Sequence, residues 1–193
     1  MAIFHNDLKA LVKENIEIIK KAEHLWQTGE TEIVYEIILL PPKERFFQGA
    51  DPVLVKEVQK ITKRKLLGYV QVLLIKFETK FLPDARLHTL ARQELFLLKE
   101  GIRTGETFAM INEFFPFRNL YAAGRIKILN RFSGRGVGSR VMCYVLDDLK
   151  ARGIRFVTGG TTIPGNMGRL FKAYGFVEFR NPASYAPIWA RRL

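Results

Sequence analysis

The stretch that most constrains this chain covers residues 125–149, where an apolar segment, a glycine-rich loop and an amphipathic segment follow one another. Ile126 and Ile128 alternate with polar residues, as in a half-buried strand. Gly134, Gly136 and Gly138 then occupy every second position of the loop. Beyond the loop, apolar residues recur at helical spacing: Val141, Met142, Val145, Leu146 and Leu149. A strand feeding a glycine loop that opens a helix is suited to phosphate, because the backbone approaches the anion closely and the helix presents N–H groups.

The glycine spacing separates this loop from two common nucleotide-binding loops. It reads G-x-G-x-G rather than the dinucleotide G-x-G-x-x-G, and Thr158 stands where a ribose-binding acid is expected. No Lys-Ser or Lys-Thr pair follows the glycines, which excludes the nucleoside-triphosphate loop. A plain tight turn between a strand and a helix remains the alternative.

The loop resembles the acyl-CoA-binding motif of the GNAT superfamily of N-acyltransferases, Gln/Arg-x-x-Gly-x-Gly/Ala, which falls here on residues 133–138. A second motif of that family, Leu-Tyr-x-x-x-Gly-Phe, resembles residues 170–176. The motifs occur in the family's order, and the resemblance covers about residues 120–193. It implies an acyl-CoA-dependent N-acyltransferase that moves an acetyl or similar group from acetyl-CoA, or another acyl-CoA, to an amine.

The resemblance also implies which residues hold the CoA thioester. In the family, the strand before the loop pairs with the pantetheine arm, the loop amides bind the pyrophosphate, and an Asn opening the next helix contacts the cofactor. Arginine side chains near the loop add phosphate contacts. The residues carried over on this basis are Ile126, Lys127, Ile128, Arg131, Gly134, Arg135, Gly136, Val137, Gly138, Ser139 and Asn166.

The residues that transfer protons in the family have no clear counterparts in this sequence. Many relatives use the Tyr of the second motif to protonate the leaving thiolate, whereas this chain has Phe171 there. Tyr174 lies about one turn later and is the candidate substitute, with packing against the sheet as the alternative. Relatives also place a carboxylate before the loop as a base, and residues 121–124 contain none. Glu106 and Glu113 are the remaining candidates, with a surface position as the alternative for each.

The expected fold is a single α/β (α+β) domain over residues 1–193, GNAT-like, with a central mixed, mostly antiparallel sheet flanked by helices. Residues 1–117 would form the acceptor side and 118–193 the acyl-CoA-binding half. Hydrophobic patterning predicts helices over 6–28 and 51–65, a helical insertion around 84–101, and helices after the loop and over 166–174. It predicts strands over 32–40, 66–77, 154–157, 177–179 and within 185–193, while 106–117 is ambiguous.

The net charge of +12 is unevenly placed. Residues 1–117 contain 17 Lys and Arg against 16 Asp and Glu, whereas residues 118–193 contain 14 against 3. The excess exceeds the need of one small anion, so nucleic acid or an acidic protein is a second candidate partner. The rival function is therefore a non-catalytic or nucleic-acid-directed protein on the same fold that binds RNA or DNA through its basic half. A solvated basic surface is the third interpretation.

Composition indicates a cytoplasmic protein. No apolar run reaches the 18 or so residues of a membrane span, and the charged N-terminal segment does not resemble a secretory signal. The single cysteine, Cys143, excludes an intrachain disulfide and is predicted to be a small core residue of its helix. The three histidines are scattered, so no metal site is predicted. The sequence contains no pattern that identifies the acceptor amine, the acyl length or the oligomeric state.

Overall fold

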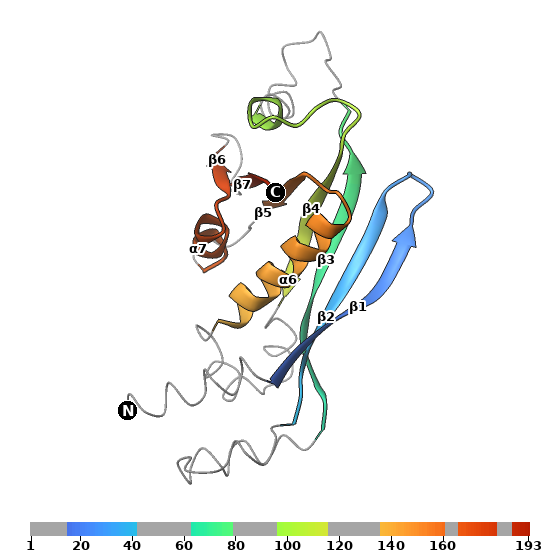
Figure 1. Ribbon diagram of the computed structural model, residues 1–193, viewed down its shortest axis with the longest axis vertical. Helices are drawn as coiled ribbons and strands as arrows, with labels where there is room; N and C mark the ends of the chain where they lie inside the picture. Colours follow the sequence, from blue (N-terminus) through green and yellow to red (C-terminus); the bar gives the residue numbers. More distant parts are fainter. Residues whose placement is uncertain (1–14, 42–62, 79–95, 116–135, 161–165, 181–186) are drawn as a thin grey trace. The chain divides into compact units, whose positions relative to one another are not determined.

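The computed structural model describes residues 15–41, 63–78, 96–115, 136–160, 166–180 and 187–193. Figure 1 shows the elements in chain order: β1 Ile16–Leu25, β2 Thr31–Leu39, β3 Lys65–Lys76, β4 Thr107–Phe115, α6 Val137–Ala151, β5 Phe156–Gly160, α7 Asn166–Ala173, β6 Val177–Phe179 and β7 Ile188–Arg192. The strands form a seven-stranded sheet in the order β1-β2-β3-β4-β5-β7-β6. β4 and β5 are parallel, and β7 is antiparallel to both β5 and β6. The predicted α+β fold with a mixed sheet is confirmed.

The chain divides into two compact units. The first comprises Met1–Lys21, Val34–Val70 and Phe114–Val145, and the second comprises Ala22–Ile33, Gln71–Glu113 and Leu146–Leu193. That residues 1–193 act as a single domain stays a prediction.

The predicted helix over residues 6–28 is wrong where the structure describes it, because Ile16–Leu25 form the strand β1. The apolar residues at its start fit both periods, since Ile16 and Ile19 have helical spacing whereas Ile16 and Ile18 alternate. A tight turn ends β1: the N–H of Trp26 donates to the carbonyl of Glu30 over 2.8 Å. Gly29, at φ 86°, donates to the carbonyl of Trp26 over 2.9 Å. This turn returns the chain to β2, so β-pairing prevails over helical propensity.

The strands β2 and β3 confirm the predictions over 32–40 and 66–77. In β2 every second side chain is buried, with Ile33, Tyr35, Ile37 and Leu39 at 0 to 1% exposure. β3 has neighbours on both sides in the sheet, as its nearly continuous apolar sequence predicts. Such a strand has no exposed edge to protect.

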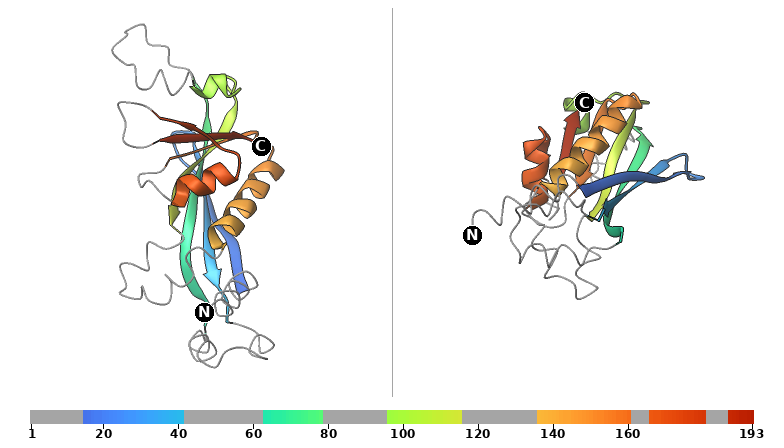
Figure 2. Two further views of the ribbon diagram at one scale, coloured as in Figure 1. Left: turned by 90° about the vertical axis from the view of Figure 1, so that its left-hand side faces the viewer. Right: turned by 60° about the horizontal axis from the view of Figure 1, so that its bottom comes forward.

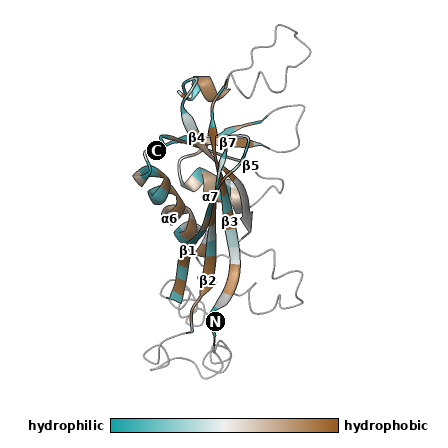
Figure 3. Cartoon of the chain, turned by 90° about the vertical axis from the view of Figure 1, so that its right-hand side faces the viewer, coloured by the Kyte–Doolittle hydropathy of each residue, from teal (hydrophilic) through white to brown (hydrophobic). Residues whose placement is uncertain are grey.

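The helix α6 confirms the amphipathic segment after the glycine loop. Val141, Met142, Val145 and Leu149 are each 0% exposed, and Figure 3 shows apolar and polar residues on different sides of the helix. Cys143, by contrast, is exposed, so its prediction as a core residue is wrong. It lies one position beyond Met142, which rotates its side chain by about 100° out of the buried stripe.

The second unit builds its sheet from residues far apart in the sequence. Val157 of β5 pairs with Ala109 of β4 on one side and with Arg191 of β7 on the other. The left view of Figure 2 shows β6 beside β7, in agreement with the pairing of Glu178 with Trp189. The buried cluster of this region consists of Phe77, Ile102, Phe108, Phe156 and Ala190.

Several expected elements lie wholly or partly outside the described residues. The ambiguous segment 106–117 is a strand over Thr107–Phe115. Of the expected insertion around 84–101, residues 96–99 are helical and 84–95 lie outside the described part. Residues 51–62 of the helix predicted over 51–65 and the predicted strand at 125–128 also lie outside it. The described end of that helix prediction is wrong, because residues 63 and 64 are not helical and Lys65 begins β3. No described helix is both long and apolar enough to cross a membrane.

Candidate functional site

The first turn of α6 is the described part of the predicted phosphate site. Gly136 adopts φ 83°, a left-handed conformation that favours glycine, and its carbonyl accepts the N–H of Arg140 over 2.9 Å. This is the first α-helical hydrogen bond of α6. The amides of Val137 and Gly138 precede it, so the helix itself provides them with no acceptor. The second glycine of the motif therefore positions the start of the helix.

The electrostatics of this helix end favour an anion. α6 has 15 residues and no acidic side chain in its first turn, so nothing within the turn offsets the positive end of its dipole. Arg140 lies in that turn and is exposed. The arrangement matches the sites at which helix N-termini bind phosphate.

The structure describes only part of the predicted cofactor set. Gly136 is exposed, Val137 is buried, Gly138 is half-buried and Ser139 is exposed. Asn166 is the first residue of α7. The other predicted residues lie outside the described part: Ile126, Lys127, Ile128, Arg131, Gly134 and Arg135.

The second motif marks the end of α7. The N–H of Phe176 donates to the carbonyl of Phe171 over 3.0 Å, and Gly175 adopts φ 74°. The rings of Phe171 and Phe176 pack with centroids 4.8 Å apart. This is a Schellman ending with its hydrophobic contact, which requires a large apolar residue, then glycine four positions later, then another apolar residue. The form of the motif at 171–176 thus has a purely structural explanation.

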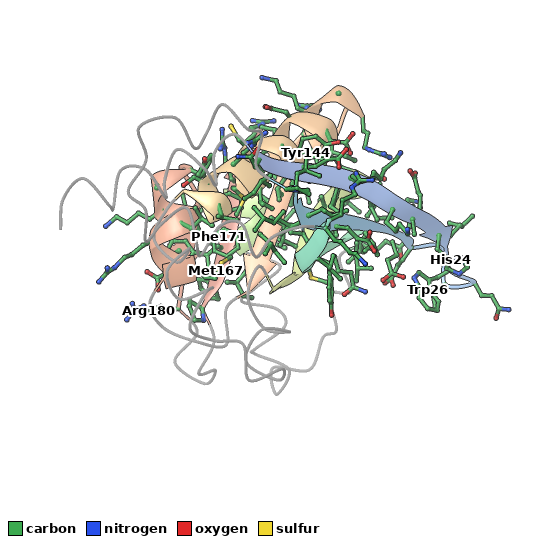
Figure 4. The ribbon with its side chains drawn as sticks, turned by 90° about the horizontal axis from the view of Figure 1, so that it is seen from below. His24, Trp26, Tyr144, Met167, Phe171 and Arg180 are labelled. Carbon is green, nitrogen blue, oxygen red and sulfur yellow. The ribbon has the colours of Figure 1, made fainter. Side chains whose placement is uncertain are left out.

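Phe171 is fully buried between α7 and the sheet. It is 0% exposed, and its ring stacks on Trp189 with centroids 5.9 Å apart. A Cβ added to Gly159 of β5 would lie 2.4 Å from Cζ of Phe171. Figure 4 shows Phe171 on α7 together with Met167. A side chain held in this way against the β5 backbone is a packing residue.

Tyr174, the predicted substitute acid, follows α7 and is half-buried. Its carbonyl oxygen accepts a hydrogen bond of 2.6 Å from Nη1 of Arg191, which lies on β7. A guanidinium at this position satisfies a carbonyl at the C-terminal end of the helix. The contact fixes the backbone of Tyr174, and the catalytic assignment stays a prediction.

The two candidate bases lie at different places along β4. Glu106 precedes the strand, and its side chain is 17% exposed. Its Oε2 accepts the N–H of Arg103 over 3.0 Å, and its Oε1 lies 3.9 Å from Nε of Arg155. Glu113 lies within β4, two residues beyond Ile111, the last residue seen to pair with β5. The two glutamates are seven positions apart, or about 23 Å along a strand.

A cluster of charged residues formed by Arg152, Asp148 and Glu23 was not predicted from the sequence. Arg152, at the end of α6, donates from Nε to Asp148 over 2.8 Å and from both terminal nitrogens to Glu23 over 3.1 and 3.2 Å. The hydrogen bond to Glu23 raises the pKa of Arg152 above its ordinary value, despite the opposing effect of desolvation. Arg152 therefore stays charged at any pH at which proteins are studied. Its pairing with a residue 129 positions away has no signature in the sequence.

Comparisons with known proteins give only remote similarity. No protein-family model matches the sequence, and no curated protein matches it. The solved structures that match include two that align over most of both chains. The crystal structure of AtaTR bound with AcCoA is 12% identical, with a TM-score of 0.47, covering 92% of this chain and 94% of that one. A tyrosine-to-phenylalanine mutant of KacT is 14% identical, with a TM-score of 0.38, covering 91% and 95%. These similarities do not by themselves assign a function.

The described residues contain no group of three or more His, Cys, Asp or Glu side chains that could hold a metal ion.

Proposed function

We propose that this protein is an acyl-CoA-dependent N-acyltransferase, with acetyl-CoA as the first donor to test and an amine as acceptor. The observation that carries the proposal is the start of α6. The predicted motif ends on the first turn of a long helix, its Gly136 has the left-handed conformation, and no acidic side chain occupies that turn. A plain strand–helix turn requires neither the absence of acidic side chains from the first helical turn nor a glycine at the second helical position.

The residues present at this helix end fit the diphosphate of CoA. The amides of Val137 and Gly138 have no acceptor within the helix, and the uncompensated dipole attracts negative charge. Gly138 carries no side chain to obstruct the phosphates. When bound, acetyl-CoA supplies an acyl group activated as a thioester. The protein's part is then to hold the donor, to accept an amine beside it and to exclude water.

Transfer requires a neutral amine and stabilisation of the departing thiolate. Glu113 is the better candidate for receiving the amine proton, because it lies beyond the last observed β4–β5 pair, whereas Glu106 already accepts the N–H of Arg103. Tyr174 is the proposed proton donor to the thiolate. Phe171 has no proton to give and is 0% exposed.

Calorimetry of the full chain with acetyl-CoA tests the proposal. The matched variants are Gly138→Ala and Gly138→Glu, because the resembled motif accepts Gly or Ala at this position. A glutamate in the first helical turn favours the helix dipole by about 0.3–1 kcal/mol, so the variant should remain folded. We expect wild type and Gly138→Ala to bind, and Gly138→Glu to lose binding through bulk and like charge. Absence of binding by the folded wild-type chain at concentrations well above micromolar would contradict the proposal.

A second candidate is suggested by the charge distribution, namely a protein of this fold that binds nucleic acid without catalysis. Residues 118–193 contain 14 Lys and Arg against 3 Asp and Glu, and many of the described ones are exposed. The exposed basic residues after α6 include Arg155, Arg169, Lys172, Arg180 and Arg192. Such binding weakens steeply with salt, because phosphate contacts release counterions. A salt-independent affinity for RNA and DNA would eliminate this candidate.

A further inference from the structure

A pocket of about 580 Å³ lies in the second unit, where β4 and β5 begin and α6 ends. Its lining comes from two loops, one before β4 and one between α6 and β5. The residues are Arg103, Thr104, Glu106, Thr107, Arg152, Gly153, Ile154 and Arg155. The lining therefore includes three arginines and two threonines, against a single glutamate.

Two of these charged groups are already engaged by the protein. Arg152 is held by two hydrogen bonds to Glu23 and one to Asp148. Glu106 is 17% exposed and accepts the main-chain N–H of Arg103, which fixes its carboxylate at the edge of the loop. These contacts order the walls of the pocket, and Arg152 is flanked by two carboxylates.

The remaining polar groups are donors that face solvent. The side chain of Arg155 is 57% exposed and forms a long ion pair with Glu106, its Nε 3.9 Å from Oε1, without a hydrogen bond. Arg103 is exposed, and no described carboxylate forms an ion pair with its guanidinium. Thr104 and Thr107 are exposed as well. The guanidinium groups of two arginines and the hydroxyls of two threonines are donors suited to a phosphate group, whose oxygens accept bidentate hydrogen bonds from arginine.

The geometry points to a binding site for a small phosphorylated molecule in this pocket, with the phosphate between Arg103 and Arg155. The volume is in the range of pockets for small ligands and exceeds what a bare phosphate fills, so the ligand carries further groups. The large basic excess of residues 118–193 favours approach of such an anion from solution.

This site is separate from the one proposed for CoA and does not depend on it. The CoA diphosphate is assigned to the first turn of α6, whereas Gly153 and Arg155 follow its last turn. A helix of 15 residues is about 22 Å long, so one phosphate group cannot reach both ends. The two proposals can therefore fail independently.

The test is an NMR titration of the full ¹⁵N-labelled chain with inorganic phosphate, following the arginine Nε–H signals at constant ionic strength. Sodium acetate serves as a second titrant, to separate phosphate recognition from recognition of any oxyanion. The variants are Arg103→Gln and Arg155→Gln. The matched control is Arg180→Gln, an arginine whose side chain is 82% exposed and pairs with Glu178 outside the pocket. Gly138→Glu serves as the control for the α6 site.

We expect saturable shifts of the Arg103 and Arg155 signals with phosphate, and a weaker response to acetate. Each pocket variant should lower the affinity about tenfold or more, because it removes charge-assisted hydrogen bonds. Arg180→Gln should bind phosphate as the wild type does, and Gly138→Glu should leave the phosphate-dependent shifts of the Arg103 and Arg155 signals unchanged. The inference is overturned if the shifts do not saturate, if acetate acts equally, if both pocket variants retain binding, or if Gly138→Glu abolishes it.

Discussion

The contact between Gly159 and Phe171 allows a prediction with a magnitude. An alanine Cβ at position 159 would lie 2.4 Å from Cζ and 2.9 Å from Cε1 of Phe171, whereas carbon atoms in contact normally stand about 3.5–4.0 Å apart. The ring must therefore retreat by about 1 Å. Trp189 and Phe176 pack against the same ring, with centroids 5.9 and 4.8 Å away, and restrict that movement.

We expect Gly159→Ala to lower the free energy of unfolding by about 1–3 kcal/mol, the usual cost of overpacking a core. Gly159 is not among the described glycines with positive φ, so alanine meets no backbone strain and the cost is steric. For a chain of this size each kcal/mol lowers Tm by about 2–4 °C. Urea denaturation measures the change, provided that the m-value is unchanged.

The double variant with Phe171→Leu provides the control. Leucine lacks the ring atoms that meet the new methyl group, so the loss from Gly159→Ala should largely disappear in this background. The single change Phe171→Leu should itself cost about 1–3 kcal/mol, since it leaves a cavity. We expect a coupling free energy of about 1–2 kcal/mol between the two positions. Additive costs, or a Gly159→Ala variant as stable as the wild type, would refute the reasoning.

Three further predictions concern the candidate site and its surroundings. Phe171→Tyr restores the tyrosine of the resembled motif. It should destabilise the chain by about 1–3 kcal/mol and leave kcat no higher, because the hydroxyl would be forced against β5. A rise in kcat would show that the ring reaches the reacting atoms. Arg152→Ala should lower the free energy of unfolding by about 1–2 kcal/mol, because it removes three hydrogen bonds. The control Arg180→Ala should lower it by less than about 0.5 kcal/mol. Equal effects of the two variants would contradict a stabilising role for Arg152. Once transfer to an amine has been measured, Glu113→Gln should reduce kcat/KM at least about a hundredfold while Glu106→Gln has little effect; the opposite ranking would move the base to the start of β4.

The local features of this chain could be predicted because their causes are local. Gly153 ends α6 by donating to the carbonyl of Lys150, and Gly175 ends α7 in the same way. In each case the glycine sits four positions after a buried apolar residue, and a few neighbouring residues decide the geometry. The alternation of buried and partly exposed side chains in β2 could also be predicted, since one face of that strand is buried.

Other features could not be predicted, because residues distant in the sequence decide them. Ile16–Leu25 form a strand since β2 offers hydrogen-bonding partners after the turn at Gly29, although the same residues fit a helix. The contacts of Glu106 with Arg103 and Arg155 likewise depend on the fold, and its role as a base stays a prediction.

By itself the sequence determined the helices α6 and α7, the apolar central strand, and the glycine motif whose last residues begin α6. Only the tertiary structure decided that Phe171 lies against Gly159, and that Arg103, Arg152 and Arg155 border one pocket. The physical reason is the distance along the sequence between the residues that make each contact. Helix ends and strand alternation depend on neighbours within a few residues, whereas a buried contact or a charged cluster exists only after β4, β5 and α6 have come together.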